Sequence, residues 1–125
     1  MKLNEIYTRA VNLCGSNDTG EYMDFALAAV NQLYGEAFYE NNSLRRSKGK
    51  AKLENIPTAV SLDEEFAFEE ELAAAFAYGW ASRLLIADSD IDEGRHIIYQ
   101  NFFTTMVNTW RKATEEAVED SYAVD

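Results

Sequence analysis

The residue types that most often carry chemistry are sparse in this chain of 125 residues. His96 is the only histidine, and Glu93 stands three positions before it. The Glu-x-x-His spacing places both side chains on one helical face, where di-metal bundles use the motif twice as a ligand pair. Because the chain has no second histidine, we expect no metal site, and we expect His96 to be half-buried or on the surface.

Acidic side chains gather at Glu69–Glu71 and again at Glu116 and Glu119. All-helical nucleotide pyrophosphohydrolases bind magnesium with Glu-x-x-Glu on one helix and Glu-x-x-Asp on the next. Here no helix is predicted after Glu119, and the spacing of Glu21 and Asp24 occurs at the opposite end of the chain, in the wrong order. We therefore expect these carboxylates to be solvated helix ends.

The single cysteine, Cys14, excludes an internal disulfide and a four-cysteine zinc site. It follows a predicted helix and has no cationic neighbour in sequence that would activate its thiol, so we expect a small packing residue. The chain also lacks a Gly-rich phosphate loop, a Gly-x-Ser-x-Gly elbow and a His–Cys pair. These features predict a protein that is not an enzyme and takes no cofactor and no small-molecule substrate.

One cluster of side chains does predict a binding role, and it is basic. Five of the eleven lysines and arginines fall within eight positions, namely Arg45, Arg46, Lys48, Lys50 and Lys52. The formal net charge of −11 argues against general binding to a nucleic-acid backbone. A local basic segment can still dock on an acidic surface, either of another copy of this chain or of a nucleic-acid-bearing partner. The alternative is an ordinary solvated loop.

Two stretches near the beginning of the chain are predicted to be helices. Residues 3–14 have helical apolar spacing and end before Gly15, a residue that takes the left-handed cap conformation easily. Residues 19–40 follow a capping box of Asp18 and Glu21. Gly35 within this second helix costs roughly 1 kcal/mol relative to alanine, which a close neighbouring backbone would explain. The apolar stripe of the second helix comprises Tyr22, Phe25, Ala26, Ala29, Val30, Leu33 and Ala37.

Residues 61–87 form the predicted helix around which the others pack, either continuous or with a break near residues 66–68. A capping box of Ser61 and Glu64 opens it, and apolar residues then circle most of its surface, which indicates burial on several sides. Gly79 marks the expected closest approach of a neighbouring backbone. A fourth helix, from about 90 to 119, begins with a box of Asp90 and Glu93. Its stripe comprises Tyr99, Phe102, Phe103, Met106, Trp110, Ala113 and Ala117. We expect Tyr78, Trp80 and the aromatic residues of this stripe to lie in the core, or in part at a subunit interface.

Residues 41–60 break the helical pattern and contain Gly49 and the only proline, Pro57. A connection of that length is usually functional or disordered. The sequence therefore predicts one all-α domain over residues 1–125, a small bundle of four main helices with a long basic loop between helices 2 and 3. No membrane span and no secretory signal are expected.

Three stretches, taken in order, resemble the small all-helical head–tail connector (adaptor) proteins of tailed bacteriophages and prophages. Tyr22–Leu33 resembles the second helix of that family. Ile56-Pro57 leading into Ser61–Glu65 resembles the entry to its central helix, a proline followed by S-L-D-D/E-E. Ala77–Ala81 resembles its Y-G-L-A signature, with Trp80 where the family more often has leucine. The match covers roughly residues 18–109.

The resemblance implies a structural protein of the virion neck that is present in the bacterial cytoplasm during assembly. Copies would form a ring beneath the portal protein, extend the DNA channel of the filled head and present a surface to the tail or stopper protein. DNA would be met only as passing channel content. In such proteins the loop between helices 2 and 3 can contact neighbouring subunits or the portal, which fits the stretch 45–52. The alternative is a non-catalytic bacterial helical protein with an interaction or regulatory role.

Overall fold

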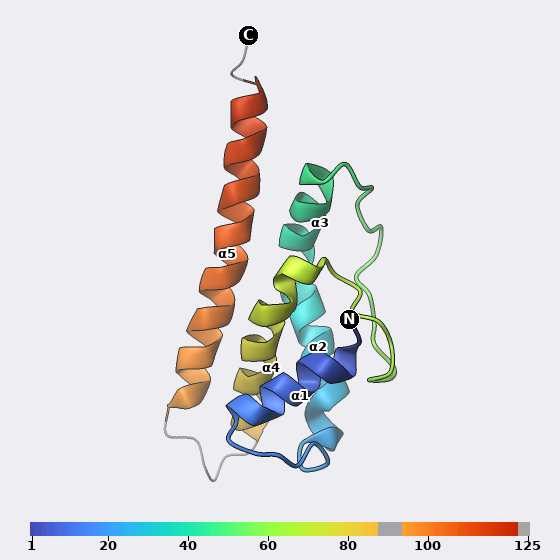
Figure 1. Ribbon diagram of the computed structural model, residues 1–125, viewed down its shortest axis with the longest axis vertical. Coiled ribbons are helices and arrows are strands. Elements are labelled where there is room, and N and C mark those ends of the chain that lie inside the picture. Colours follow the sequence, from blue (N-terminus) through green and yellow to red (C-terminus); the bar gives the residue numbers. More distant parts are fainter. Residues whose placement is uncertain (88–93, 123–125) are drawn as a thin grey trace.

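The computed structural model describes residues 1–87 and 94–122, with side chains described as far as residue 110. Within these ranges the chain is helical and contains no strand, so the predicted all-α class is confirmed. Figure 1 shows the helices lying side by side, with α5 running past the others towards the C-terminus. The elements are α1 (Leu3–Leu13), α2 (Met23–Glu36), α3 (Phe38–Ser47), the 3-10 turn η1 (Glu70–Leu72), α4 (Ala73–Ala87) and α5 (Arg95–Tyr122).

The predicted second helix is in fact two helices, and it begins later than expected. The chain bends at Ala37, where φ is −107° and ψ is 11°, and α3 then continues to Ser47. The prediction that residues 41–60 form a loop was therefore wrong for 41–47, which belong to α3. Asp18 does not cap α2, because its side chain accepts the N–H of Gly20 within the preceding turn. The loop is residues 48–69.

Gly15 and Gly49 end α1 and α3 with the same hydrogen-bonded cap. Their φ angles are 83° and 76°, in the left-handed region that favours glycine. In each case the N–H of the glycine bonds a carbonyl three positions back, and the N–H of the next residue bonds one five positions back. This Schellman arrangement satisfies carbonyls that a helix end leaves without partners. The predicted stop at Gly15 is confirmed.

The predicted start of the central helix at Ser61 was wrong, because helix α4 begins only at Ala73. Glu64 does accept the backbone N–H groups of Val60 and Ser61, but the backbone here bonds to the first residues of the chain instead of continuing as a helix. The carbonyls of Leu62 and Glu64 accept the N–H groups of Asn4 and Leu3, both at 2.9 Å. The segment therefore satisfies the exposed donors of α1.

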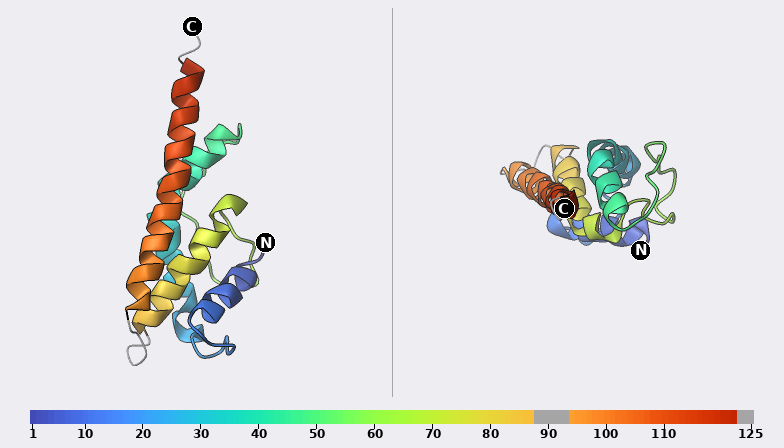
Figure 2. Two further views of the ribbon diagram at one scale, coloured as in Figure 1. Left: turned by 60° about the vertical axis from the view of Figure 1, so that its left-hand side comes forward. Right: turned by 90° about the horizontal axis from the view of Figure 1, so that it is seen from above.

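Helix α4 lies at the centre of the molecule, as predicted, and packs against α1, α2 and α5. Trp80 is fully buried, with its ring centroid 5.3 Å from that of Tyr7. The end of the loop contributes to the same core, since Phe68 packs edge-on against Phe76 with centroids 5.6 Å apart. Helix α3 packs on α5. Seen from above in Figure 2, α5 and the loop lie on opposite sides of the bundle.

Two glycines inside helices have different surroundings. A Cβ on Gly79 would lie 2.8 Å from Leu33 Cδ2 and 2.8 Å from Phe103 Cδ2. The close approach expected there exists, although side chains of α2 and α5 make it rather than backbone. A Cβ on Gly35 would meet nothing within 4 Å, so the close neighbour proposed for that glycine is absent.

The apolar stripe of α5 is only partly buried. Phe103 and Val107 face the core, whereas Phe102 and Trp110 are 46% and 36% exposed. The expectation of core positions was therefore right for Phe103 and wrong for Phe102 and Trp110. The side chains of residues 113 and 117, and residues 90 and 93 with their capping box, lie outside the described part of the chain.

Arg83 is the single charged residue of α4, and it connects three helices. Its side chain is 17% exposed and donates hydrogen bonds to Gln32 and Glu36 on α2 and to Gln100 on α5. The charge is thus accommodated at the edge of the core. None of the helices in the described ranges is long and apolar enough to cross a bilayer.

Candidate protein-binding site

The five basic residues predicted to bind a partner lie together at the end of α3. Arg45 and Arg46 belong to its last turn, and the three lysines follow in the first residues of the loop. The structure separates them into two groups by what they contact. Arg45 and Lys48 contact carboxylates of this chain, Arg46 and Lys52 line a surface hollow, and Lys50 does both.

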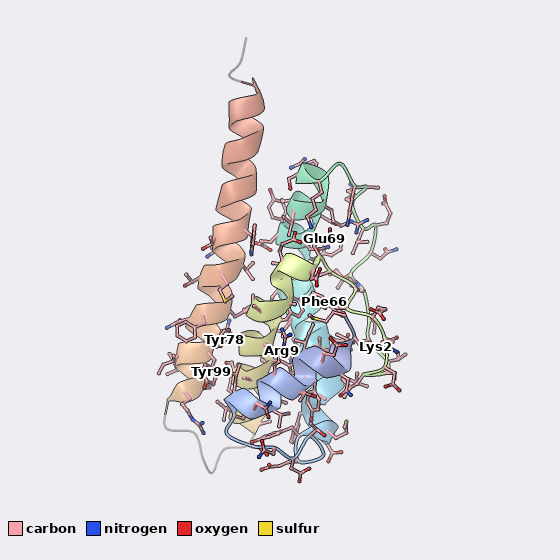
Figure 3. All side chains as sticks on the ribbon, in the orientation of Figure 1. Lys2, Arg9, Phe66, Glu69, Tyr78 and Tyr99 are labelled. Atoms are coloured by element: carbon pink, nitrogen blue, oxygen red, sulfur yellow. The ribbon has the colours of Figure 1, made fainter. Side chains whose placement is uncertain are left out.

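Glu69 is the centre of the first group. Its carboxylate lies 3.3 Å from Arg45 Nη1, 3.2 Å from Lys48 Nζ and 2.7 Å from Lys50 Nζ. The side chain of Glu69 is only 7% exposed, so the expectation that Glu69 is solvated was wrong. Figure 3 shows it between α3 and the start of α4. Three of the five basic residues therefore hold a buried carboxylate of their own chain.

The pKa of Glu69 reflects this environment. Burial by itself raises that pKa, but hydrogen bonds from Lys50 and Lys48, together with their charges, bring it below the usual value. Lys48 also bonds Glu71, and this hydrogen bond is the main reason why the pKa of Lys48 is raised. At neutral pH both Glu69 and Lys48 are therefore ionised.

Three asparagines, none of which the sequence reading had selected, fasten the loop to α2 and α3. Asn31 accepts the N–H of Ala59 at 2.7 Å and donates to its carbonyl at 3.1 Å. Asn42 makes the same two-way pair with Leu53, at 2.8 and 3.2 Å. Asn41 Oδ1 accepts the N–H of Glu69 at 2.8 Å. The sequence contains a signal for these contacts. Asparagine is unfavourable inside helices, so its presence there indicates that its side chain makes a hydrogen bond elsewhere.

The second group of basic residues lines a hollow of about 400 Å³, which we call the basic hollow. Its lining consists of Tyr39, Asn42, Ser43, Arg46, Lys50 and Lys52. Within the described chain, the side chains of Arg46 and Lys52 take part in no hydrogen bond or ion pair. Tyr39 stands beside them with 62% of its surface exposed. The hollow thus combines two unpaired cations with an exposed aromatic ring.

A second, more apolar surface lies between α1 and α4. A groove of about 350 Å³ is lined by Arg9, Asn12, Leu13, Ala74, Ala77 and Tyr78. The ring of Tyr78 packs against Phe102 at 5.1 Å and Tyr99 at 5.7 Å. Figure 3 shows Tyr78 and Tyr99 near each other on α4 and α5. Tyr78 and Tyr99 are half-buried in this contact.

The other residues considered for chemistry are placed as follows. His96 is half-buried, and its carbonyl accepts the Ser82 hydroxyl at 2.8 Å. The Cys14 thiol is buried and donates to the carbonyl of Ala81 at 3.6 Å. Glu93 and the side chains of residues 116 and 119 lie outside the described part of the chain. Across the described residues, no group of three or more histidine, cysteine or acidic side chains is arranged to hold a metal ion.

Comparisons with known proteins add no relative, since no protein-family model, no curated protein and no solved structure matches this chain. The described residues form an all-helical protein, and the basic surface at the end of α3 is partly occupied by carboxylates of the same chain and partly open.

Proposed function

We propose that this chain is a structural protein of the neck of tailed bacteriophages or prophages, a head–tail connector. Copies assemble into a ring between the portal protein and the tail or stopper protein, completing the DNA-filled head and extending the DNA channel. The protein works by assembly, without catalysis. It is made in the bacterial cytoplasm and ends in the virion neck.

The sequence resemblance supports this proposal, and so does the all-α class of the fold, although Ser61–Glu65 does not open the central helix as the resemblance implied. Tyr22–Leu33 lies mostly in α2, and Ala77–Ala81 lies in the buried middle of α4. Residues 56–65 supply the carbonyls that receive the first N–H groups of α1. The three resembling stretches thus all contribute to the helical framework of the protein. Proteins that share a fold need similar residues at such framework positions.

The observation that carries a binding role is the unpaired state of Arg46 and Lys52. Acidic residues outnumber basic ones by 22 to 11 in this chain, yet these two cations contact no acidic residue of the described structure. They lie beside the exposed ring of Tyr39. Arginine and tyrosine are enriched at protein interfaces and often dominate their binding energy. A partner protein is therefore the ligand that this surface suits.

Deleting the gene from an inducible prophage tests the proposal. The expected result is DNA-filled heads that lack tails, with the wild-type protein detected by mass spectrometry in purified virions. A second measurement mixes the purified chain with the portal protein encoded by the same prophage and looks for added density at the portal by electron microscopy. Normal tailed particles from the deletion strain would overturn the proposal. They would favour the non-catalytic bacterial interaction or regulatory protein.

A further inference from the structure

We propose that the basic hollow binds an acidic segment of the partner protein through Arg46 and Lys52, whereas Arg45 and Lys48 hold carboxylates of their own chain. Of the five clustered basic residues, only some would therefore contact the partner directly. This inference rests on the proposed function for the identity of the partner, which would be the portal or the stopper protein. The chemistry of the segment follows from the hollow itself.

The wall of the hollow is fixed before any partner arrives. Arg45 Nε donates to the carbonyl of Ala51 at 2.7 Å, and Asn42 holds Leu53 by two hydrogen bonds. Gly49 turns the chain back at the end of α3. Lys50 is tied to Glu69 by its ammonium group. A site that is already in its bound shape loses less conformational entropy on binding, so modest contacts can suffice.

The electrostatics of the hollow favour a negative ligand. The cap at Gly49 satisfies the carbonyls of Arg45 and Arg46, so these oxygens do not face the hollow as free acceptors. Glu69 and Glu71 compensate the charge of Lys48 and its neighbours. Arg46 and Lys52 remain positively charged, with N–H groups free to donate hydrogen bonds. The guanidinium group of Arg46 suits the two oxygens of a carboxylate.

The size of the hollow and the charge around it favour a short acidic peptide segment over nucleic acid. Duplex DNA carries one negative charge per ~1.7 Å of axis, so it would continue beyond the hollow along a chain whose net charge is −11. A run of a few aspartates or glutamates can instead end within about 400 Å³. Tyr39 offers its exposed ring to an apolar residue next to those carboxylates.

The test uses a fluorescein-labelled peptide of eight glutamates and fluorescence anisotropy at low ionic strength, where exposed charges are least screened. We expect the wild-type chain to bind it and the double variant Arg46→Ser, Lys52→Ser to bind about tenfold more weakly, since each exposed ion pair contributes only a few-fold. The matched control is Lys2→Ser, Arg9→Ser, which removes the same two residue types from exposed positions of α1 and its start (Figure 3). The control should bind within twofold of wild type.

Equal loss in both double variants would overturn the inference, because the peptide would then respond to net charge and not to the hollow. Absence of binding by wild type would overturn it as well. Tighter binding of a labelled eight-nucleotide oligothymidylate than of the peptide would assign the hollow to nucleic acid instead. If the hollow binds the peptide as expected but the deletion strain still makes tailed particles, the inference stands and the proposed function fails.

Discussion

The side chain of Asn41, fully buried on α3, accepts the backbone N–H of Glu69 at 2.8 Å across 28 positions of sequence. This bond fixes the backbone of the residue whose carboxylate Arg45, Lys48 and Lys50 surround. It therefore holds the end of the loop, which carries Glu69, against α3, whose end carries the cations. The position of the cations depends on a neutral amide that contacts none of them.

Replacing Asn41 with alanine should lower the free energy of unfolding by about 1–3 kcal/mol, because the buried N–H of Glu69 would lose its acceptor. Urea denaturation measures this change, and amide hydrogen exchange should show faster exchange at Glu69. Asn108→Ala is the control, because Asn108 is exposed on α5 and should change stability by less than about 0.5 kcal/mol. Equal effects of the two substitutions would contradict the role assigned to Asn41.

The two helical glycines should respond in opposite directions to the same substitution. Gly79→Ala should destabilise the protein by about 1–3 kcal/mol, since the new methyl group would overlap Leu33 and Phe103. Gly35→Ala should stabilise it by up to about 1 kcal/mol, because alanine favours the helix and meets no neighbour there. Thermal denaturation of both variants measures the two changes, and a stabilising Gly79→Ala would refute the packing described for α4.

Glu69→Gln should destabilise the protein at neutral pH and have a smaller effect in acid. The pKa of Glu69 is lower in the folded state than in the unfolded chain, so its charge contributes stability above the unfolded pKa, and this contribution is lost as pH falls through the folded pKa. Urea midpoints of wild type and variant should therefore converge between neutral pH and about pH 3. Glu70→Gln, at an exposed neighbouring position, is the control and should show no such convergence.

Cys14 should react with a thiol reagent only when the protein opens. Its side chain is 6% exposed and packs beside α4, so alkylation in the native state requires an unfolding event. The labelling rate should rise in the Gly79→Ala variant with the population of the opened state, about tenfold for each ~1.4 kcal/mol of lost stability. Labelling of the native wild type as fast as in urea would show that the thiol is accessible after all.

The helices that could be predicted were those whose apolar residues repeat with helical spacing. Residues 3–14 and the apolar run up to residue 87 were recognised in this way, and so was the central place of α4. Helix α3 was missed because its residues are mostly polar, with Leu44 as its one buried aliphatic side chain. Its stability depends on packing against α5, which no local pattern records.

The basic cluster could be predicted because its five members are neighbours in sequence. Their division into two groups could not, because Glu69 follows them by 19 to 24 positions and its contacts arise only when the loop folds back. The start of α4 was misplaced for the same kind of reason. Ser61 and Glu64 have the residue types of a helix cap, but the start of α1 takes the carbonyls of that segment.

Arg83 has a consequence for how the helices are aligned. Apolar surfaces built from alanine and phenylalanine can slide past one another, and a slide of one helical turn moves a helix by about 5.4 Å. Such a slide of α5 would take Gln100 away from Arg83, and a shift of α2 would remove Gln32 and Glu36. The guanidinium group would then stay at the edge of the core without partners, which is costly. The single charge of α4 thus selects one alignment of the helices among several that apolar contacts alone would allow.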